Sequence, residues 1–194
     1  MRRIMNVTLP TPDARTRILD AVERIVVARG VAGLTLEAAA REAGVSKGGL
    51  LYHFASKEAL LTGLLERLAA FIRSEFEKNC ARQPPGPGRV ARAFLAWAFG
   101  EADCTPGDEH HERAAAVFLA AFHHDRALLD PMRAVYAGMK AALLEDGLPQ
   151  GHAMAVLTAC DGLFMAHLFG LYRPTEADLV ALRGTLDALV EGHT

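Results

Sequence analysis

A short stretch near the start of the chain gathers side chains that can contact a polyanion. Between positions 46 and 57 lie a serine, two lysines, paired glycines, a tyrosine and a histidine, and a threonine precedes them at position 35. Lysines neutralise phosphates, hydroxyl and imidazole groups hydrogen-bond to phosphates or base edges, and glycines let a backbone approach a duplex closely. The candidate nucleic-acid contacts are therefore Thr35, Ser46, Lys47, Gly48, Gly49, Tyr52, His53 and Lys57.

Two short helices must position these groups, and the sequence marks the turn between them. A threonine and a serine are predicted N-caps for helices over 36–43 and 46–53. Gly44 supplies a turn conformation that a side chain resists, Ala40 lets the two helices cross closely, and Leu50 points inward. This spacing is typical of a helix-turn-helix, whose second helix enters the major groove of DNA.

The rest of the chain is also predicted to be helical. Apolar residues recur every three or four positions, and no alternating run is long enough to propose a strand. The strongest breaker is a Pro/Gly-rich segment at 83–88, which we expect to act as a linker. The pattern predicts an all-α fold, with domains over 1–57 and 58–194. The predicted helices are 13–29, 36–43, 46–53, 57–80, 88–102, 109–124, 127–146, 150–172 and 175–191.

Composition and charge narrow the class of protein. The 194 residues are 51% hydrophobic and 23% charged, which is typical of a globular protein, and the 3 cysteines do not suggest a disulfide framework. The longest stretch without Asp, Glu, Lys or Arg, 147–160, is too short to span a membrane. We therefore expect a soluble cytoplasmic protein with no membrane partner. Residues 1–60 are net basic and 61–194 net acidic, which favours a polyanion at the N-terminal end only.

The run from Leu36 to Leu60 resembles the signature of the TetR-like (tetracycline-repressor-type) transcriptional regulators, and the resemblance covers about residues 13–60. It implies an N-terminal three-helix helix-turn-helix domain followed by a helical ligand-binding and dimerisation domain. Tyr52 and the histidine after it match positions that face DNA in the family, whereas Leu51 stands where the family usually has tyrosine. Gly49 matches a base-reading position without a side chain, which implies readout there through backbone approach and DNA shape.

The C-terminal helices predict a partner subunit. The helix over 150–172 is apolar or small on nearly all sides, so every side of it must be covered. A second copy of the chain could cover one face, with the last helix completing a four-helix bundle. We therefore predict a homodimer through residues 150–191, bound to a palindromic operator in double-stranded DNA. The alternative is a central core helix in a monomer.

The same body carries candidates for a small-molecule site. Ligand pockets are mostly apolar with few polar groups, and aromatic residues collect here. Asp161 is expected to cap a helix, to form a salt bridge, for example with Arg133 or an arginine of the partner, or to contact a ligand. His167 is expected to be a core histidine or a ligand contact. By the family's mechanism, a small hydrophobic or amphipathic effector would release a repressor from its operator. The candidates are Phe71, Phe94, Trp97, Phe118, Phe122, Asp161, Phe164 and His167.

Other classes of protein remain as alternatives. Metal-ligand residue types are dense from Glu109 to Glu112 and from His123 to Asp125. Adjacent histidines point in different directions, and no His-Glu-x-x-His is present, so we predict no metal, no cofactor and no enzyme activity. One alternative is a DNA-binding protein whose body only dimerises. The other is a helical small-molecule carrier or enzyme with an incidental helix-turn-helix-like hairpin.

Overall fold

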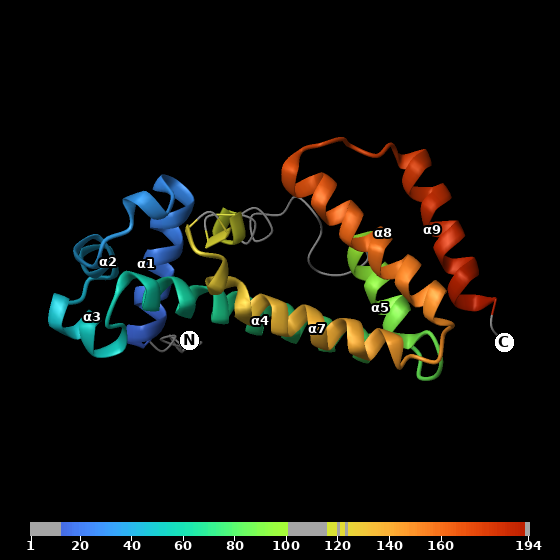
Figure 1. Cartoon of the computed structure of the whole chain (residues 1–194), viewed down its shortest axis with the longest axis horizontal. Coiled ribbons are helices and arrows are strands. Elements are labelled where there is room, and N and C mark those ends of the chain that lie inside the picture. Colours follow the sequence, from blue (N-terminus) through green and yellow to red (C-terminus); the bar gives the residue numbers. More distant parts are fainter. Residues whose placement is uncertain (1–12, 101–115, 120, 123, 193–194) are drawn as a thin grey trace, which may run out of the picture. The chain divides into compact units, whose positions relative to one another are not determined.

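The computed structural model describes residues 13–100, 116–119, 121–122 and 124–192, and all regular elements in these ranges are helical (Figure 1). The predicted all-α fold is therefore confirmed. None of the described helices is long and apolar enough to cross a membrane. The chain divides into two compact units, Met1–Leu64 and Leu65–Thr194.

The first unit is a small helical domain. It contains α1 (Ala14–Arg29), a 3-10 turn (Val31–Gly33), α2 (Leu36–Ala43), α3 (Lys47–His53) and the first turns of α4 (Lys57–Arg82). α1 packs against α2 and α3, so the apolar residues at helical spacing face one another. The side chains that lose nearly all contact with solvent are Ile18, Leu19, Val22, Leu34, Leu50 and Leu60.

Short-range contacts form the starts of α2 and α3 and the turn between them, as the sequence predicts. Oγ1 of Thr35 accepts the backbone N–H of Ala38, and Oγ of Ser46 accepts the backbone N–H of Gly49, each at 3.0 Å. Gly44 ends α2 in the left-handed conformation, with φ 64° and ψ 37°. These contacts satisfy backbone groups that helix ends leave unpaired. The predicted caps and the turn glycine are confirmed.

The second unit is built around α8. It contains the rest of α4, α5 (Arg89–Ala98), a 3-10 turn (Arg126–Leu129), α7 (Asp130–Leu144), α8 (Gln150–Phe169) and α9 (Glu176–Glu191). α8 contacts α5, α7 and α9. The helix predicted over 150–172 is confirmed to within three residues, and it ends at Phe169 because Gly170 adopts φ 59°. Most of the helix predicted over 109–124 lies outside the described residues.

The Pro/Gly-rich segment between α4 and α5 is fixed by hydrogen bonds on both sides. Nε of Arg89 donates to the carbonyl oxygen of Cys80, at 2.7 Å, near the end of α4. The backbone N–H of Gly88 donates to the carbonyl of Asp146 at 2.9 Å, and the Asp146 carboxylate accepts the N–H of Ala91 at 2.9 Å. The end of α4, the start of α5 and the turn after α7 are therefore held together.

Candidate nucleic-acid interface

The outward side of α3 presents most of the candidate contacts to solvent. Gly48, Gly49, Tyr52 and His53 are all exposed, and Tyr52 is 86% exposed. Its ring meets the ring of His53 edge-on, with the centroids 5.1 Å apart. The opposite side of the helix is anchored by Leu50, which is fully buried. A fixed helix therefore displays a hydroxyl, an imidazole and bare backbone on one surface.

Two of the three hydroxyl candidates, Thr35 and Ser46, already have partners in the structure. The oxygens of Thr35 and Ser46 accept backbone N–H groups at the starts of α2 and α3. A hydroxyl that accepts in this way still has its own O–H free to donate. Each residue can therefore cap its helix and donate a hydrogen bond to an acceptor such as a phosphate oxygen at the same time.

Lys47 places a positive charge at the start of α3. Its Nζ lies 2.6 Å from Oε1 of Glu37, and both side chains are more than half exposed. The hydrogen bond from Lys47 lowers the pKa of Glu37 below its ordinary value. Exposed ion pairs contribute little to stability. The Lys47 ammonium can therefore exchange this carboxylate for another anion at small cost.

Lys57, in the first turn of α4, is held inside the unit. Its Nζ donates to the carbonyl oxygen of Val31 at 2.6 Å in a part-buried position. This hydrogen bond ties the start of α4 to the 3-10 turn after α1. The sequence indicated a phosphate contact or a solvated charge for Lys57 and not this hydrogen bond, because the carbonyl partner lies 26 positions earlier in the chain. Two further N–H groups of the ammonium are available to an anion.

The residue that directly follows α3 packs closely against α4. Phe54, directly after α3, is buried, and the guanidinium of Arg15 lies 5.5 Å from its ring centroid. A Cβ added to Gly63 in α4 would lie 2.7 Å from Cε1 of Phe54 and 3.3 Å from Cδ2 of Leu19. Sequence reasoning missed this contact. The only signal for it was a glycine inside a long helical pattern.

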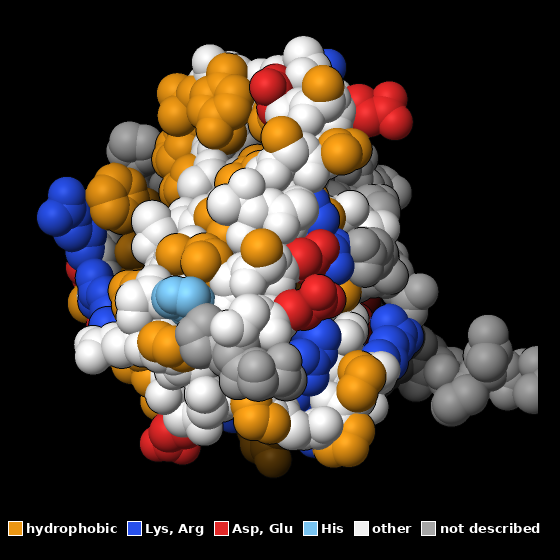
Figure 2. Space-filling view, turned by 90° about the vertical axis from the view of Figure 1, so that its right-hand side faces the viewer, with side chains coloured by type: hydrophobic (Ala, Val, Ile, Leu, Met, Phe, Trp, Pro, Cys, Tyr) orange, Lys and Arg blue, Asp and Glu red, His pale blue; other side chains and the backbone are white. Residues whose placement is uncertain are grey.

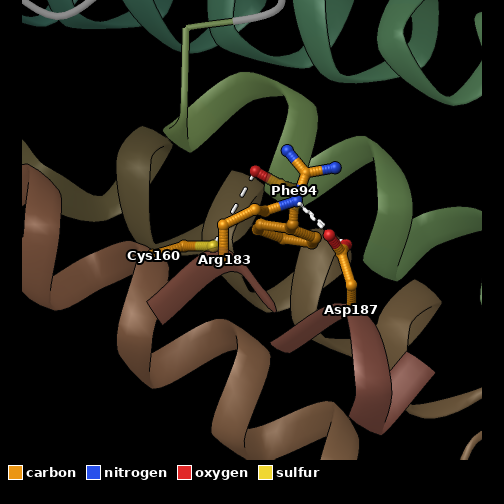
Figure 3. Close-up of polar contacts among 4 residues, drawn as sticks. All are labelled: Phe94, Cys160, Arg183 and Asp187. Carbon is orange, nitrogen blue, oxygen red and sulfur yellow. Dashed lines mark hydrogen bonds and ion pairs between the residues drawn. The ribbon is translucent and has the colours of Figure 1, made fainter. Parts of the chain in front are cut away.

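In the second unit, α5, α8 and α9 meet around a small polar cluster (Figure 3). The thiol of Cys160 donates to the carbonyl of Phe94 at 3.7 Å, and burial raises the pKa of Cys160 to about 12. Nε of Arg183 lies 2.9 Å from both carboxylate oxygens of Asp187, and its guanidinium lies 5.5 Å from the ring centroid of Phe99. The thiol is therefore neutral at physiological pH. The arginine pairs with a carboxylate of its own helix, α9.

Asp161 in α8 is half-buried, and that burial raises the pKa of its carboxyl group. The expected pairing with Arg133 was wrong, because Arg133 bonds instead to Asp130 on its own helix at 2.6 Å. Within the described part of the chain, Asp161 has no hydrogen-bond or ion-pair partner. Tyr136 of α7 is also affected: its own burial and the charge of Asp161 raise its pKa to about 12. Sequence reasoning singled out Asp161 but missed Tyr136.

The other ligand candidates do not share one environment. Phe94 is a core residue whose ring centroid lies 5.6 Å from that of Phe76. The interpretation of His167 as a core histidine was wrong, since it lies exposed in the last turn of α8. The partly exposed candidates are Trp97, Phe118 and Phe164, and Phe71 and Phe122 are exposed.

The exposed residues of α8, and those of α9 between Leu179 and Val190, include no Asp, Glu, Lys or Arg, whereas the two ends of α9 carry exposed acidic residues. A Cβ added to Gly151, Gly162 or Gly184 would meet no atom within 4 Å. Figure 2 shows hydrophobic side chains and uncharged white surface over much of the face on this side of the molecule. The exposed residues of α8 are Gln150, Gly151, Thr158, Gly162, His167 and Phe169, and those of α9 between Leu179 and Val190 are Val180, Ala181, Gly184, Thr185 and Ala188.

Within the described ranges, no group of three or more His, Cys, Asp or Glu side chains could hold a metal ion. The segment from Glu109 to Glu112, and His123, lie outside those ranges. The prediction that the protein binds no metal therefore stays a prediction.

Two families match the chain over most of its length. Residues 18–64 match the family described as bacterial regulatory proteins, tetR family. Residues 88–191 match the tetracyclin repressor-like C-terminal domain. The second match covers the body, where the sequence offered no resemblance of its own.

Curated relatives match a short part of the chain. The HTH-type transcriptional regulator SrpR of Pseudomonas putida is 42% identical over 53 residues, which are 27% of this chain and 25% of that protein. TtgR, another HTH-type transcriptional regulator of Pseudomonas putida, is 41% identical over 56 residues, 29% of this chain and 27% of that protein. The matches thus span about a quarter of the length of these relatives.

Solved structures resemble the whole chain. A member of the TetR family from Streptomyces coelicolor is 27% identical with a TM-score of 0.62, over 92% of this chain and 99% of that one. The multidrug binding protein EbrR, in complex with malachite green, is 28% identical with a TM-score of 0.66 over the same shares of the two chains. Both units therefore have counterparts in single solved chains.

Proposed function

The chain belongs to the TetR family of bacterial regulatory proteins, and from this premise we propose that it is a sequence-specific DNA-binding transcriptional regulator. The observation that carries the proposal is the outward side of α3, with its exposed glycines and a tyrosine that is 86% exposed. In this proposal α3 enters the major groove and Tyr52 and His53 meet the DNA. Lys47, Lys57 and the capping hydroxyls contact phosphates.

We propose that the protein acts as a homodimer through α8 and α9. The support is the absence of Asp, Glu, Lys and Arg among the exposed residues of α8 and of the middle of α9, where glycines leave room for a close helix neighbour. A second copy would cover both helices at once in a four-helix bundle. Two copies of α3 would then read the two halves of a palindromic operator.

Oligomeric state tests this interface directly. Gly162→Leu places a large side chain on the proposed contact and is expected to shift the protein from dimer to monomer, as measured by light scattering after size exclusion. Gly138→Leu is the matched control, because Gly138 lies in α7 with equally open space at its Cβ position. A dimer that persists in Gly162→Leu, or a monomeric wild-type protein, contradicts the proposed interface.

We propose further that a small hydrophobic or amphipathic effector, carrying a positive charge, binds the body and releases the DNA. The support is the half-buried carboxylate of Asp161, which has no partner within the described residues and whose burial disfavours the charged form. A cationic ligand would offset the free-energy cost of keeping this carboxylate charged when it is half-buried. EbrR, a similar protein, is complexed with the organic cations malachite green and ethidium.

Selection from a random-sequence duplex pool tests DNA binding. Enrichment of one palindrome that survives raised salt is expected, whereas retention that is blind to sequence or absent contradicts the proposal.

On the enriched duplex, Tyr52→Ala and Lys47→Ala are each expected to weaken binding by about 1–3 kcal/mol. Lys140→Ala is the matched control, since Lys140 is an exposed lysine of α7. Equal affinities of all three variants and the wild type refute the assigned surface.

Ethidium is a practical probe for the effector site, because its fluorescence reports binding. Asp161→Asn keeps the shape of the side chain and removes its charge, so it is expected to weaken ethidium binding about tenfold or more. Binding of an anionic hydrophobic dye is the control and is expected to stay equal or strengthen. If Asp161→Asn binds ethidium as tightly as the wild type does, Asp161 does not contact the cationic ligand and the proposed site is wrong.

A further inference from the structure

The middle of the outward side of α3 is apolar. Leu51 is 40% exposed, although its neighbour Leu50 is completely buried in the core of the same unit. Leu51 therefore keeps a large part of its side chain in contact with solvent. One turn earlier on the same side lies Gly48, where an added Cβ would meet no atom within 4 Å. Residues three positions apart are neighbours on a helix surface, so Leu51 protrudes beside bare backbone.

Hydrogen-bonding groups are sparse around this leucine. Gly48 and Gly49 have no side chains, and the oxygen of Ser46 accepts the N–H of Gly49. The ammonium of Lys47 is directed to Glu37 on α2. The first turn of α3 can therefore offer a base pair few side-chain donors or acceptors, and the hydroxyl of Tyr52 and the imidazole of His53 lie at the end of the helix. What α3 offers at position 51 is a branched apolar group.

We propose that Leu51 reads the C5-methyl group of a thymine in each half of the operator, which makes it a specificity-determining residue. The inference rests on the DNA-binding function proposed above and goes beyond it by naming what one side chain recognises. In the major groove of unmodified DNA, the thymine methyl is the only apolar group that a base edge presents. Gly48 complements this role, because the absence of its side chain lets α3 approach the bases closely enough for a leucine to reach them.

Deoxyuridine isolates the methyl group, since it differs from thymidine only by lacking that group and keeps the O4 acceptor and the base pairing. The duplex recovered from the random-sequence pool is remade with one thymine at a time replaced by deoxyuridine. At one thymine in each half, the wild-type protein is expected to bind about fourfold more weakly, as loss of one buried methyl group predicts. Replacing both symmetry-related thymines is expected to weaken binding about fifteenfold.

Variants connect that effect to Leu51. Leu51→Ala is expected to bind the thymine duplex more weakly and to bind the two duplexes equally, whereas Leu51→Met is expected to keep the preference. Val27→Ala removes another exposed apolar side chain of the same unit, on α1, and serves as the matched control. Thermal unfolding of each variant shows that it is folded at the assay temperature.

The outcomes separate this inference from the function on which it rests. A duplex that is bound specifically, with no deoxyuridine position that affects wild type and Leu51→Ala differently, overturns the role of Leu51 and leaves DNA binding intact. The same preference in Leu51→Ala as in the wild type assigns the methyl contact to another residue. Failure to recover any specific duplex refutes the proposed function and this inference with it.

Discussion

Replacing Gly63 with alanine tests how tightly α4 packs against the end of α3. The added Cβ would lie 2.7 Å from Cε1 of Phe54 and 3.3 Å from Cδ2 of Leu19. Neither neighbour has free space, because Phe54 is 5% exposed and Leu19 is 1% exposed. Arg15 also lies over the phenylalanine ring at 5.5 Å. The ring or the helix must therefore move when Gly63 gains a side chain.

Two opposing contributions set the size of the effect. Glycine to alanine inside a helix gains about 1 kcal/mol of stability. Overpacking a filled core costs about 1–3 kcal/mol. Gly63→Ala is therefore expected to lower the free energy of unfolding by about 1 kcal/mol. Gly138→Ala in α7 meets no atom within 4 Å, so it is expected to gain about 1 kcal/mol.

Thermal unfolding at equal protein concentration compares the two variants with the wild type. For a chain of this size, a change of about 1 kcal/mol moves the midpoint by about 2–4 °C. We expect Gly63→Ala to unfold below the wild type and Gly138→Ala above it. Gly63→Ala is also expected to bind the selected duplex more weakly, because Phe54 directly follows α3 and its displacement disturbs that helix.

One result would refute this reasoning. If Gly63→Ala stabilised the protein as much as Gly138→Ala, the space between α4 and Phe54 would be open. The close contact between Gly63 and Phe54 would then not exist. A second variant, Phe54→Leu combined with Gly63→Ala, makes room for the new methyl group. It is expected to remove most of the clash, so that the two substitutions are non-additive.

The remaining predictions concern single side chains whose partners the structure identifies. Lys57→Ala loses a part-buried hydrogen bond to a main-chain carbonyl and is expected to lower stability by about 1 kcal/mol in thermal unfolding, whereas Lys47→Ala is expected to change DNA affinity only. The raised pKa of Asp161 means that the folded state binds more protons than the unfolded state just above pH 3.8, so stability falls as pH rises there. Asp161→Asn is therefore expected to be more stable than the wild type at pH 7, with the difference shrinking as the pH falls; a constant difference from pH 3 to 7 contradicts this. Asp146→Ala removes the acceptor for the N–H of Ala91 at the start of α5 and is expected to cost about 1 kcal/mol in urea unfolding.

The sequence determined the features of this protein that depend on neighbouring residues. Helix caps at Thr35 and Ser46 use backbone groups three positions away, and the left-handed turn at Gly44 needs only a glycine at the right place. The helical pattern of apolar residues likewise gave the buried side of α1 and α3. The motif from Leu36 to Leu60 led to the family for the same reason, because it is a local run of residue types.

Only the tertiary structure decided which partner each side chain takes. Lys57 bonds to a carbonyl 26 positions earlier, Arg133 pairs with Asp130 and not with Asp161, and His167 is exposed at the end of α8. The close contact between Gly63 and Phe54 also depends on how two helices cross. Burial and pairing depend on elements far apart in the sequence, and the spacing of residues along one helix does not specify which residues of another helix they meet.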